Sequence, residues 1–493
     1  MTSHRPAAVI VLAAGGGTRM KSATAKVLHR VAGRTLVGHA LSAAREAEAD
    51  HVVVVIRHER EQVAEHVAQL DPQALLADQD DVPGTGRAVE CGLAVLPPGL
   101  SGTVLVSMGD VPLLSGDTLR TLLEAHTARG SQVTVVTAVP DDPTGYGRIL
   151  RDGHGRVVGN VEHKDATHDQ LRIAEVNTGI YAFEMAALRP ALAQIGTENA
   201  QGEKYLTDVI GVVHGAGGRV DGHRLDDVWQ TAGVNDRVQL AAVGAELNRR
   251  IVETWMRAGV TVVDPRTTWI DADVTIGRDV TIYPQTQLYG ASTIGNDVVL
   301  GPDTTLTDVE IADEASVVRT HGSLAVIGRG ASVGPFAYLR PGTLLGADGK
   351  IGTFVETKNA EIGAGAKVPH LTYVGDAEIG EGTNIGAGTI FANYDGVQKH
   401  RTVVGRHVKT GAHNTFVAPV EIADGAVTGA GTVVRRDVPP GALSVSTGPQ
   451  RHLTDWVARK RAGSKAAQAA QAAQAADPVR GAAQDSESAG PQR

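Results

Sequence analysis

The chain has 493 residues and a net charge of −9 at pH 7. A chain of this length is too long for one hydrophobic core, so we expect two or three domains. The acidic balance excludes bulk affinity for nucleic acid or for an acidic membrane surface. The single cysteine, Cys91, excludes an internal disulfide framework and is typical of a reducing cytoplasm. The short apolar run at 7–14 is predicted to be a strand, so we expect a cytoplasmic protein without signal peptide or membrane span.

The first part of the chain predicts strands that alternate with helices. Apolar runs at 7–12, 51–56 and 102–108 are long enough for fully buried strands, and residues 37–48 have the spacing of a helix. This alternation is typical of an α/β, doubly wound (Rossmann-like) domain with a parallel sheet. Ligands of such domains bind outside the carboxyl ends of the strands, so we expect the functional residues there.

Two of these strand ends carry residues suited to phosphate and metal chemistry. The first run ends in a loop of three glycines at 15–17, whose exposed N–H groups can hold phosphate oxygens. Arg19 and Lys26 follow and can neutralise a triphosphate, although a plain tight turn is the alternative. The third run ends at Gly109-Asp110, where the carboxylate can bind Mg²⁺ or simply cap the next helix.

A long amphipathic helix is predicted to follow this domain. Gly259 is a suitable residue for the position just after its end. Its apolar stripe, which indicates packing rather than ligand binding, consists of Leu240, Val243, Leu247, Ile251 and Trp255. We expect this helix to join two domains.

From about residue 270 to 434, apolar residues recur at every sixth position and are often followed by glycine. The ladders include Ile276, Ile282, Leu288, Ile294 and Leu300, then Ile327, Val333, Leu339, Leu345 and Ile351, and they continue to Val434. Neither a helix nor an ordinary strand predicts this spacing, which is the signature of a parallel β-helix. The pattern resembles the hexapeptide-repeat acyltransferases, and this implies a left-handed β-helix and three chains packed side by side.

Polar residues within this repeat predict a second site. Segments 316–326 and 392–402 break the rhythm and are expected to form loops at a binding face. His370 lies between them, and a lone histidine is more often a packed or surface residue than a base. Because three hexapeptides make one coil of about eighteen residues, Arg340 and Lys358 are predicted to lie on one face, with an acidic residue at the next step. This grouping favours a functional His370.

The glycine-rich loop and later segments resemble the sugar-1-phosphate nucleotidyltransferases. The signature LxxGxGTRMxxxxPK matches positions 12–26, except that Ala25 replaces the usual proline, which is expected to loosen the approach to Lys26 without removing its charge. Further family motifs match at 78–86, 145–148, 161–165 and 175–179. The resemblance implies that UTP and its sugar-nucleotide product are bound by Leu12, Ala13, Ala14, Gly15, Lys26, Gln79, Gly84, Thr85, Gly109, Asp110, Gly147, Glu162, Asn177 and Asn235.

The same resemblance implies roles within that set. Gln79 would hydrogen-bond the uracil base, and Gly147, Glu162 and Asn177 would line the N-acetylglucosamine pocket. Arg19 and Lys26 would be catalytic, and Mg²⁺ would be shared by Asp110 and Asn235.

The whole order of parts resembles the bifunctional bacterial glucosamine-1-phosphate acetyltransferases and N-acetylglucosamine-1-phosphate uridyltransferases. The likeness covers about 8–456 and rests on RPG at 340–342, ETKN at 356–359, VPHLTYVGD at 368–376, NIGAGT at 384–389 and NYDG at 393–396. It implies acetylation of glucosamine 1-phosphate by acetyl-CoA, then uridylyl transfer from UTP, giving pyrophosphate and UDP-N-acetylglucosamine, a cell-wall precursor. It implies His370 as general base, Arg340, Lys358, Tyr373 and Asn384 as glucosamine-1-phosphate ligands, and Ala387, Asn393, Tyr394, Ala412 and Ala430 as the acetyl-CoA site.

The expected boundaries are 1–234 for the uridyltransferase domain, 235–262 for the linker helix, 263–456 for the acetyltransferase domain, and 457–493 for a low-complexity, disordered tail. The Ala-Gln repeats of that tail could be helical locally, and Trp456 either folds over the acetyl site or anchors the last helix. Ala412 and Thr447 replace a serine and an arginine common in the family, which puts two CoA contacts in doubt. The alternatives are a single-function nucleotidyltransferase whose β-helix only trimerises the chain, and a regulatory scaffold.

Overall fold

A computed structural model describes residues 5–446, 448 and 450–476 of the chain. The first domain contains strands β1 (Ala8–Leu12), β4 (Val52–Ile56), β5 (Leu75–Asp78), β6 (Thr103–Met108), β7 (Val133–Ala138), β8 (Arg148–Arg151), β9 (Val157–Val161), β10 (Val176–Glu184) and β11 (Val220–Arg224). They form one sheet in the order β11-β7-β10-β6-β1-β4-β5, with β8 and β9 attached beside β10. β6, β1, β4 and β5 are parallel, as predicted, whereas β10 runs antiparallel to β6 and β7.

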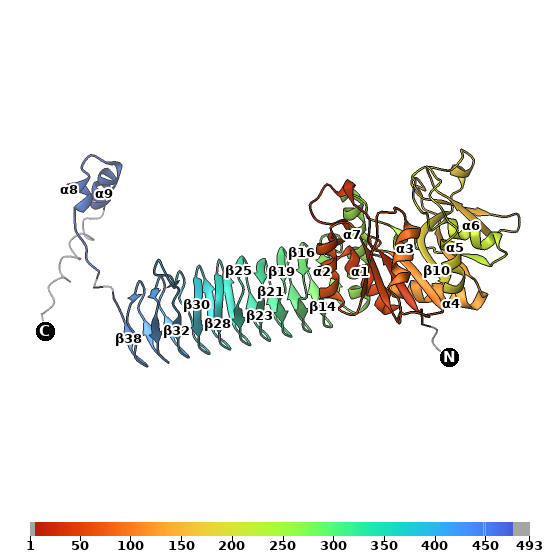
Figure 1. Cartoon of the computed structure of the whole chain (residues 1–493). Coiled ribbons are helices and arrows are strands. Elements are labelled where there is room, and N and C mark those ends of the chain that lie inside the picture. The colour runs from red at the N-terminus through yellow and green to blue at the C-terminus, as the bar shows by residue number, and fades with distance from the viewer. Residues whose placement is uncertain (1–4, 447, 449, 477–493) are drawn as a thin grey trace.

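Helices cover both faces of this sheet, in agreement with the predicted doubly wound fold (Figure 1). α1 (Leu36–Glu46), α2 (Arg60–Leu70) and α4 (Gly116–Arg129) pack on one face, and α3 (Thr85–Ala94), α5 (Met185–Leu192) and α6 (Asp208–Gly215) pack on the other. A small hairpin of β2 (Arg30–Val31) and β3 (Arg34–Thr35) precedes α1. The carboxyl ends of β6, β1, β4 and β5 therefore lie in that order along one edge of the sheet.

α7 (Arg237–Arg257) is the predicted linker helix, and its second half bonds both domains. Arg250 pairs with Asp227 of the first domain through two hydrogen bonds of 2.7 and 2.8 Å. Asn248, which is 5% exposed, donates to the Thr268 carbonyl at 2.8 Å and accepts from the Ile270 N–H at 2.9 Å. One buried amide side chain thus joins α7 to the start of the second domain.

Short strands of the second domain stack into three parallel ladders, seen as the rod in Figure 1. The first ladder contains β12 (Thr261–Val262), β15 (Thr281–Ile282), β18 (Val299–Leu300), β21 (Ser316–Val317), β24 (Ser332–Val333), β27 (Lys350–Thr353) and β29 (Lys367–His370), and continues through β33 (Lys409–Thr410), β36 (Val427–Thr428) and β38 (Leu443–Ser444). The second contains β13 (Trp269–Ile270), β16 (Thr286–Tyr289), β19 (Thr304–Thr307), β22 (Thr320–Ser323), β25 (Ala337–Leu339), β28 (Glu356–Ile362), β30 (Tyr373–Ile379), β31 (Ile390–Ala392), β34 (Thr415–Val417) and β37 (Val433–Val434). The third contains β14 (Thr275–Ile276), β17 (Thr293–Ile294), β20 (Glu310–Ile311), β23 (Ala325–Ile327), β26 (Thr343–Leu345), parts of β28 and β30, β32 (Thr402–Val404) and β35 (Val420–Ile422).

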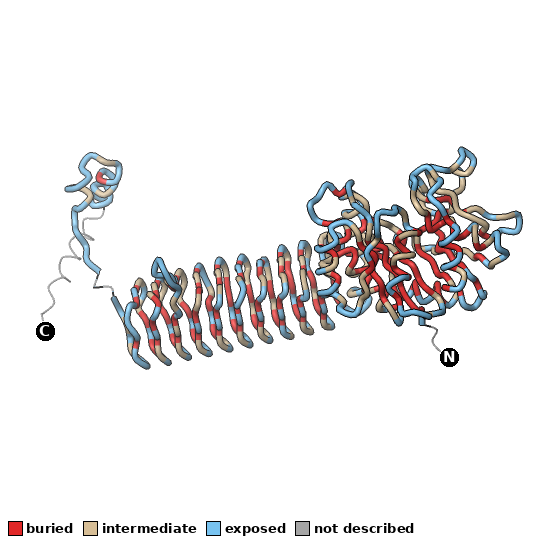
Figure 2. Tube along the Cα trace, in the orientation of Figure 1, coloured by how far each residue is buried: buried red, intermediate tan, exposed pale blue. Residues whose placement is uncertain are grey.

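The apolar residues of the predicted six-residue repeat fill the interior of this rod. Ile282, Leu288, Leu300 and Leu306 are each 0% exposed and belong to one continuous apolar cluster that runs from Val252 to Val438. Figure 2 shows this buried line along the whole rod. The predicted parallel β-helix of left-handed hexapeptide-repeat type is therefore confirmed as the fold class of the second domain.

The register corrects two details of the prediction. Segment 316–326 is not a loop but a shortened coil, because Gln287 pairs with Thr305 after 18 residues whereas Thr305 pairs with His321 after 16. Segment 392–402 does leave the rod as a loop. Lys358 pairs with Gly375, not with Asp376, because the coil between them has 17 residues. The carboxylate therefore stands beside the basic column instead of within it.

Two helices lie within the segment for which the sequence predicts disorder. α8 spans Trp456–Lys460, and α9 (Lys465–Ala476) covers the Ala-Gln repeats. The Arg461 guanidinium lies 5.3 Å from the centre of the Trp456 ring. Thr447 and residues 477–493 lie outside the described residues. Across the described part of the chain, no helix combines the length and the apolar character needed to cross a membrane.

Candidate active sites

The glycine-rich loop after β1 places Lys26 at the edge of the sheet. Gly17 has a left-handed φ of 58°, and a Cβ added there would lie 2.6 Å from the Lys26 Cβ. Only glycine fits such a backbone and such a close approach. Lys26 begins a short 3₁₀ turn and extends its ammonium group back towards β6.

Asp110, Lys26 and Asn235 meet although they are far apart in the sequence. The Lys26 ammonium forms an ion pair with Asp110 and donates to the Asn235 Oδ1 atom at 3.3 Å. The side chains of Lys26 and Asp110 are only 11% and 14% exposed. Asp110 and Asn235 each supply an oxygen, which is the donor type that Mg²⁺ prefers, and Mg²⁺ commonly takes its other ligands from phosphates and water. The described residues contain no cluster of three or more His, Cys, Asp or Glu side chains suited to a metal.

A cavity of about 350 Å³ lies over these strand ends. It is lined by many of the residues predicted to bind the nucleotide, namely Leu12, Ala13, Ala14, Gly15, Lys26, Gln79, Gly84, Thr85 and Asp110. Gly109 lies directly beside it and donates its N–H to the Leu12 carbonyl at 2.9 Å. The predicted catalytic residue Arg19 lies instead on an exposed turn, Thr18–Met20, outside the lining of this cavity.

The loop between β5 and α3 is held in one conformation by Gln79 and Lys204. The Gln79 side-chain amide donates to the carbonyls of Val82 at 3.0 Å and Gly84 at 3.1 Å. The Gly86 N–H donates to the Lys204 carbonyl at 2.8 Å, and the Lys204 N–H donates back to Pro83 at 2.9 Å. This loop is therefore rigid enough to present fixed groups to a ligand.

The residues predicted to bind the sugar also converge. The Asn177 N–H donates to the Gly147 carbonyl at 2.9 Å. The Glu162 Oε1 atom accepts hydrogen bonds from Asn160 at 3.0 Å and from Thr207 at 3.1 Å, and burial raises the pKa of Glu162. Tyr146, which precedes Gly147, lies near Asp110: burial, and then the Asp110 and Asp142 carboxylates, raise the pKa of Tyr146.

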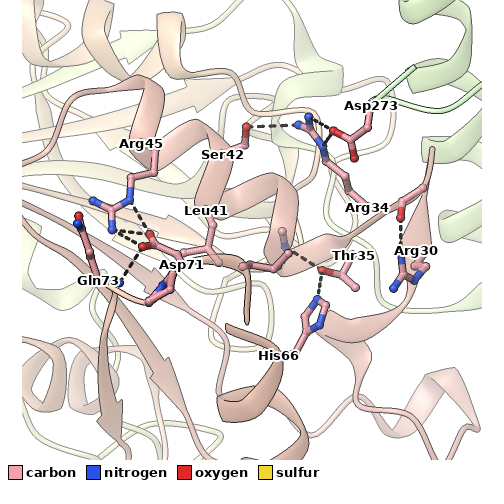
Figure 3. A pocket seen from close by; sticks show the side chains of 14 residues that line it. Arg30, Arg34, Thr35, Leu41, Ser42, Arg45, His66, Asp71, Gln73 and Asp273 are labelled. Atoms are coloured by element: carbon pink, nitrogen blue, oxygen red, sulfur yellow. Dashed lines mark hydrogen bonds and ion pairs between the residues drawn. The ribbon is translucent and has the colours of Figure 1, made fainter. Parts of the chain in front are cut away.

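A larger cavity, of about 630 Å³, lies away from these residues, between α1, α2 and the first coil of the rod (Figure 3). Two of its cations are paired with carboxylates. Arg34 bonds Asp273 of the second domain through Nε at 2.9 Å, and Arg45 bonds Asp71. None of the predicted site residues lines this cavity, and the Arg34–Asp273 contact makes it part of the junction between the domains.

In the second domain, His370 is exposed at the end of β29, and a small residue takes the equivalent position in each of the following coils. The Gly388 N–H donates to the His370 carbonyl at 3.1 Å, the His413 N–H donates to Ala387 at 2.7 Å, and the Gly431 N–H donates to Ala412 at 2.8 Å. The register of Lys367, Asn384, Lys409 and Val427 thereby aligns one residue of each coil in a column, namely His370, Ala387, Ala412 and Ala430. Three of the five predicted acetyl-CoA residues thus form a strip of methyl side chains beginning at the histidine.

A basic cluster lies around the corner from His370. Arg340 and Lys358 stand in adjacent coils, as predicted, with the Arg340 N–H bonded to the Thr357 carbonyl at 2.9 Å. Arg340 also donates to Glu356 at 3.0 Å, and the adjacent Lys399 ammonium lowers the pKa of Lys358. Three cations therefore gather on one face and favour an anionic ligand.

Tyr373, Asn393 and Tyr394 complete the neighbourhood, whereas Asn384 stands apart. A Cβ on Gly375 would lie 2.6 Å from Tyr373 Cζ and 2.7 Å from Asn393 Nδ2, so these two side chains cover that glycine. Asn393 donates to Asp376, and Tyr394 is 60% exposed on the loop that carries Lys399. Asn384 lies in the column of Lys367 and Lys409, on the other side of His370.

Known proteins share this arrangement of parts. A family model described as the MobA-like NTP transferase domain matches residues 9–201. The bifunctional protein GlmU of Kineococcus radiotolerans is 61% identical over 463 residues, which cover 94% of each chain. GlmU of Mycolicibacterium gilvum is 58% identical over 465 residues, which cover 94% of this chain and 93% of the relative. The chain belongs to the bifunctional GlmU family.

This GlmU family member contains functional-site candidates that the sequence motifs did not indicate. Arg57 and His58, which follow β4, line the cavity over the strand ends. Asn160 bonds Glu162 beside Gly147, and Lys399 joins the basic cluster. Each lies outside the motifs that the sequence analysis matched, so only the fold shows its proximity to a site. A cation within the 392–402 loop was the one available signal for Lys399.

Proposed function

We propose that the two sites of this chain divide the two reactions between them. The enzyme acetylates the amine of glucosamine 1-phosphate with acetyl-CoA, and it transfers UMP from UTP to N-acetylglucosamine 1-phosphate, with release of pyrophosphate. The observation that carries the division is the presence of two separate clusters, one around Asp110, Lys26 and Asn235 and one around His370, on different domains.

In uridylyl transfer, a phosphate oxygen of the sugar phosphate attacks the α-phosphorus of UTP and pyrophosphate leaves, so no protein nucleophile is needed. The glycine-rich loop and Lys26 hold phosphate oxygens, and the Lys26 charge offsets the negative charge that develops as the bond breaks. Mg²⁺ held by Asp110 and Asn235 would supply further charge neutralisation at the phosphates. Arg19, exposed on its turn, is proposed to close over the triphosphate.

The remaining ligands of this site follow from its layout. Gln79 with the backbone of Gly84 and Thr85 binds the base and ribose, while Leu12 to Gly15 and Gly109 form the floor. The sugar occupies the group formed by Gly147, Glu162 and Asn177. Tyr146 links that group to Asp110, so the sugar phosphate can reach the metal pair.

In acetyl transfer, His370 removes a proton from the substrate ammonium group so that the neutral amine can attack the thioester carbonyl. Histidine is suited to this role because its ordinary pKa of about 6.5 lies near working pH. The C–N bond forms, the C–S bond breaks, and the CoA thiolate leaves and takes up the second proton that the nitrogen releases. The methyl column of Ala387, Ala412 and Ala430 offers a shallow apolar path for the CoA arm, with Asn393 and Tyr394 at its side.

The sugar phosphate is proposed to bind in the basic cluster. Arg340 and Lys358 neutralise its phosphate, and Tyr373 positions the sugar ring. Asn384 lies on the other side of His370, away from Arg340 and Lys358 of the same chain. It can therefore join the other predicted sugar-phosphate ligands only where two chains pack together. This separation is one argument for an oligomeric site.

An exposed apolar edge beside His370 is a second argument for the predicted homotrimer. Phe336, Phe354 and Leu371 are 50%, 59% and 58% exposed, and the two phenylalanine rings stack at 5.4 Å. Burial of one such side chain contributes about 1.5–3 kcal/mol. We propose that the β-helices of neighbouring copies of the chain pack against each other and cover this edge. Sedimentation tests the proposal, because the Phe336→Ser/Phe354→Ser variant should then sediment as a monomer.

Two further assignments belong to this proposal. We divide the chain into 1–234, 235–262, 263–456 and 457–493, with α7 as the boundary element. We place the enzyme in the cytoplasm, where a free thiol such as Cys91 stays reduced and where nucleotide and CoA substrates are expected.

Separate knockouts test the division. His370→Ala should abolish acetyl transfer while pyrophosphate release from UTP continues, and Asp110→Ala should do the reverse. Loss of both activities in either folded variant, or of neither, would reject the proposal. An original enzyme that transfers no acetyl group, and whose uridylyl transfer His370→Ala leaves unchanged, would favour the single-function alternative.

A further inference from the structure

Arg57 occupies a defined place in the nucleotide cavity. The strand order β6-β1-β4-β5 sets the order of groups along the cavity floor. Asp110 follows β6, the glycine-rich loop follows β1, Arg57 follows β4, and Gln79 follows β5. A nucleotide with its phosphates at the glycine-rich loop and its base at Gln79 must therefore cross the end of β4. Arg57 lies under the base half, because the Gln79 N–H donates to the Ile56 carbonyl at 2.9 Å.

The Arg57 guanidinium is available for a ligand. Its carboxylate partner among the described residues is Asp81, at 3.4 Å, and the Asp81 side chain is fully exposed. An exposed pair of this length contributes little and is easily rearranged. The Arg57 side chain itself is 29% exposed and lines the cavity.

Among the described residues, the Gln79 side chain next to it has one atom, Oε1, without a hydrogen bond. Both N–H bonds of its side-chain amide are used by the carbonyls of Val82 and Gly84, so the Oε1 atom remains as an acceptor. Uracil offers a matching N3–H donor, with a carbonyl acceptor on each side. Cytosine offers an acceptor at N3, which an oxygen of Gln79 repels. When the uracil N3–H bonds Gln79, the carbonyl beside N3 needs a hydrogen-bond donor next to Gln79, and an arginine side chain can only donate.

We propose that Arg57 reads the uracil base by donating a hydrogen bond to the carbonyl that flanks N3 on the β4 side. Gln79 and Arg57, at the ends of adjacent strands, together present an acceptor and a donor that fit uracil. Arg57 is thus a specificity-determining residue of the uridylyl-transfer site. This inference rests on the uridylyl transfer proposed above.

Arg57→Met tests the proposal, because methionine keeps the length of the side chain and removes every donor. Loss of one charge-assisted hydrogen bond should lower kcat/KM for UTP about tenfold to a hundredfold. The decisive substrates are 2-thio-UTP and 4-thio-UTP, in which a weak sulfur acceptor replaces one carbonyl oxygen. The original enzyme should discriminate against one of these analogues about tenfold. Arg57→Met should use that analogue as well as UTP and should retain normal discrimination against the other.

Two controls separate the possible results. Arg60→Ala removes a nearby exposed arginine, which bonds Asp78 at 2.8 Å outside the cavity lining, and should leave all three substrates unchanged. In an Arg57→Met chain in which Trp255, Trp269 and Trp456 are replaced by phenylalanine, the fluorescence of Trp229 shows whether the first domain is folded. An equal loss for UTP and both analogues would overturn the proposal, since it would place Arg57 on the phosphates or ribose. If the original enzyme released no pyrophosphate from UTP, the proposed function itself would be wrong instead.

Discussion

The Lys26 ammonium performs two tasks that one double-mutant cycle can separate. It neutralises Asp110 within the folded domain, and it is proposed to hold UTP phosphate oxygens. Lys26→Met removes the charge, keeps the apolar stem of the side chain, and leaves Asp110 without a cation in a site where its side chain is 14% exposed. Asp110→Asn removes the carboxylate charge at nearly constant shape.

The expected cost lies between two limits. An exposed ion pair contributes about 0–1 kcal/mol, whereas removal of one partner from a fully buried pair costs about 3–5 kcal/mol. With side chains 11% and 14% exposed, Lys26→Met should lower the free energy of unfolding of the first domain by about 2–3 kcal/mol. The Lys26→Met/Asp110→Asn double variant should recover most of that loss, because it leaves no unpaired charge.

Catalysis should behave differently from stability. Lys26→Met should lower the rate of uridylyl transfer about a hundredfold to a thousandfold, as does loss of a donor aimed at developing charge. The double variant should be no faster, because neither the cation nor the metal ligand is restored. Acetyl transfer should remain unchanged in all three variants.

Urea unfolding followed by tryptophan fluorescence can measure the cycle. Trp229 is the one tryptophan of residues 1–234, so replacement of Trp255, Trp269 and Trp456 by phenylalanine gives a signal from the first domain alone. This matters because a two-domain chain need not unfold in one step. A double variant as unstable as Lys26→Met alone would refute the reasoning, since the unpaired carboxylate could not then be the cause.

Three other substitutions test local features. Asn248→Ala removes two hydrogen bonds from a side chain that is 5% exposed and should cost about 2–4 kcal/mol, so an unchanged unfolding midpoint at Trp255 and Trp269 would exclude Asn248 as the junction clamp. Gly84→Ala places a Cβ against the Lys204 carbonyl at a φ of 115° and should raise KM for UTP, without effect on acetyl transfer measured in the same preparation. Hydrogen bonds from the Gln398 N–H and then from His400 hold the pKa of Asp395 below its usual range. The Asp395 carboxylate therefore stabilises the loop that carries Lys399 fully above about pH 4, the pKa of an unfolded aspartate. This stabilisation is lost only as the pH falls through the lower pKa that Asp395 has in the folded protein. Asp395→Ala should therefore raise KM for glucosamine 1-phosphate across pH 6–8, and a rise confined to acid pH would contradict this account.

The sequence predicted the rod well because each hexapeptide records the inward position directly. Ile282 and Leu288 are buried at the inward positions of their hexapeptides, and Val280 and Thr286, two residues before them, are also 0% exposed. The length of each coil is recorded less clearly. A corner can lose one or two residues without moving the inward side chains, as in the 16-residue step from Thr305 to His321. Such a step shifts outward residues, which is why Asp376 falls beside the basic column.

A site residue could be predicted where it belongs to a sequence motif. It could not be predicted where only the order of strands in the sheet brings it to the site. The family signature identified Lys26, and the predicted strand end at Gly109-Asp110 indicated Asp110. The structure brings both together with Asn235. Arg57 belongs to no motif, and its proximity to Gln79 results from the pairing of β4 with β5. No local sequence rule expresses that pairing, because it depends on the order of strands in the sheet.

The loop at 392–402 shows how the rod gains functional groups without disturbing its core. Asn384 follows Lys367 after 17 residues and pairs with Lys409 after 25 more, so the extra residues leave between coils and the ladder resumes in register. The column from His370 to Ala430 therefore remains continuous across the insertion, while Lys399 is carried out towards Lys358. A parallel solenoid tolerates this because each coil is hydrogen-bonded only to its neighbours, so an insertion at a corner breaks no interior contact. Ala387, Ala412 and Ala430 lie in turns of successive coils, whereas Lys358 lies in β28 and Lys399 lies on the inserted loop. The alanine strip and the basic cluster can thus vary independently.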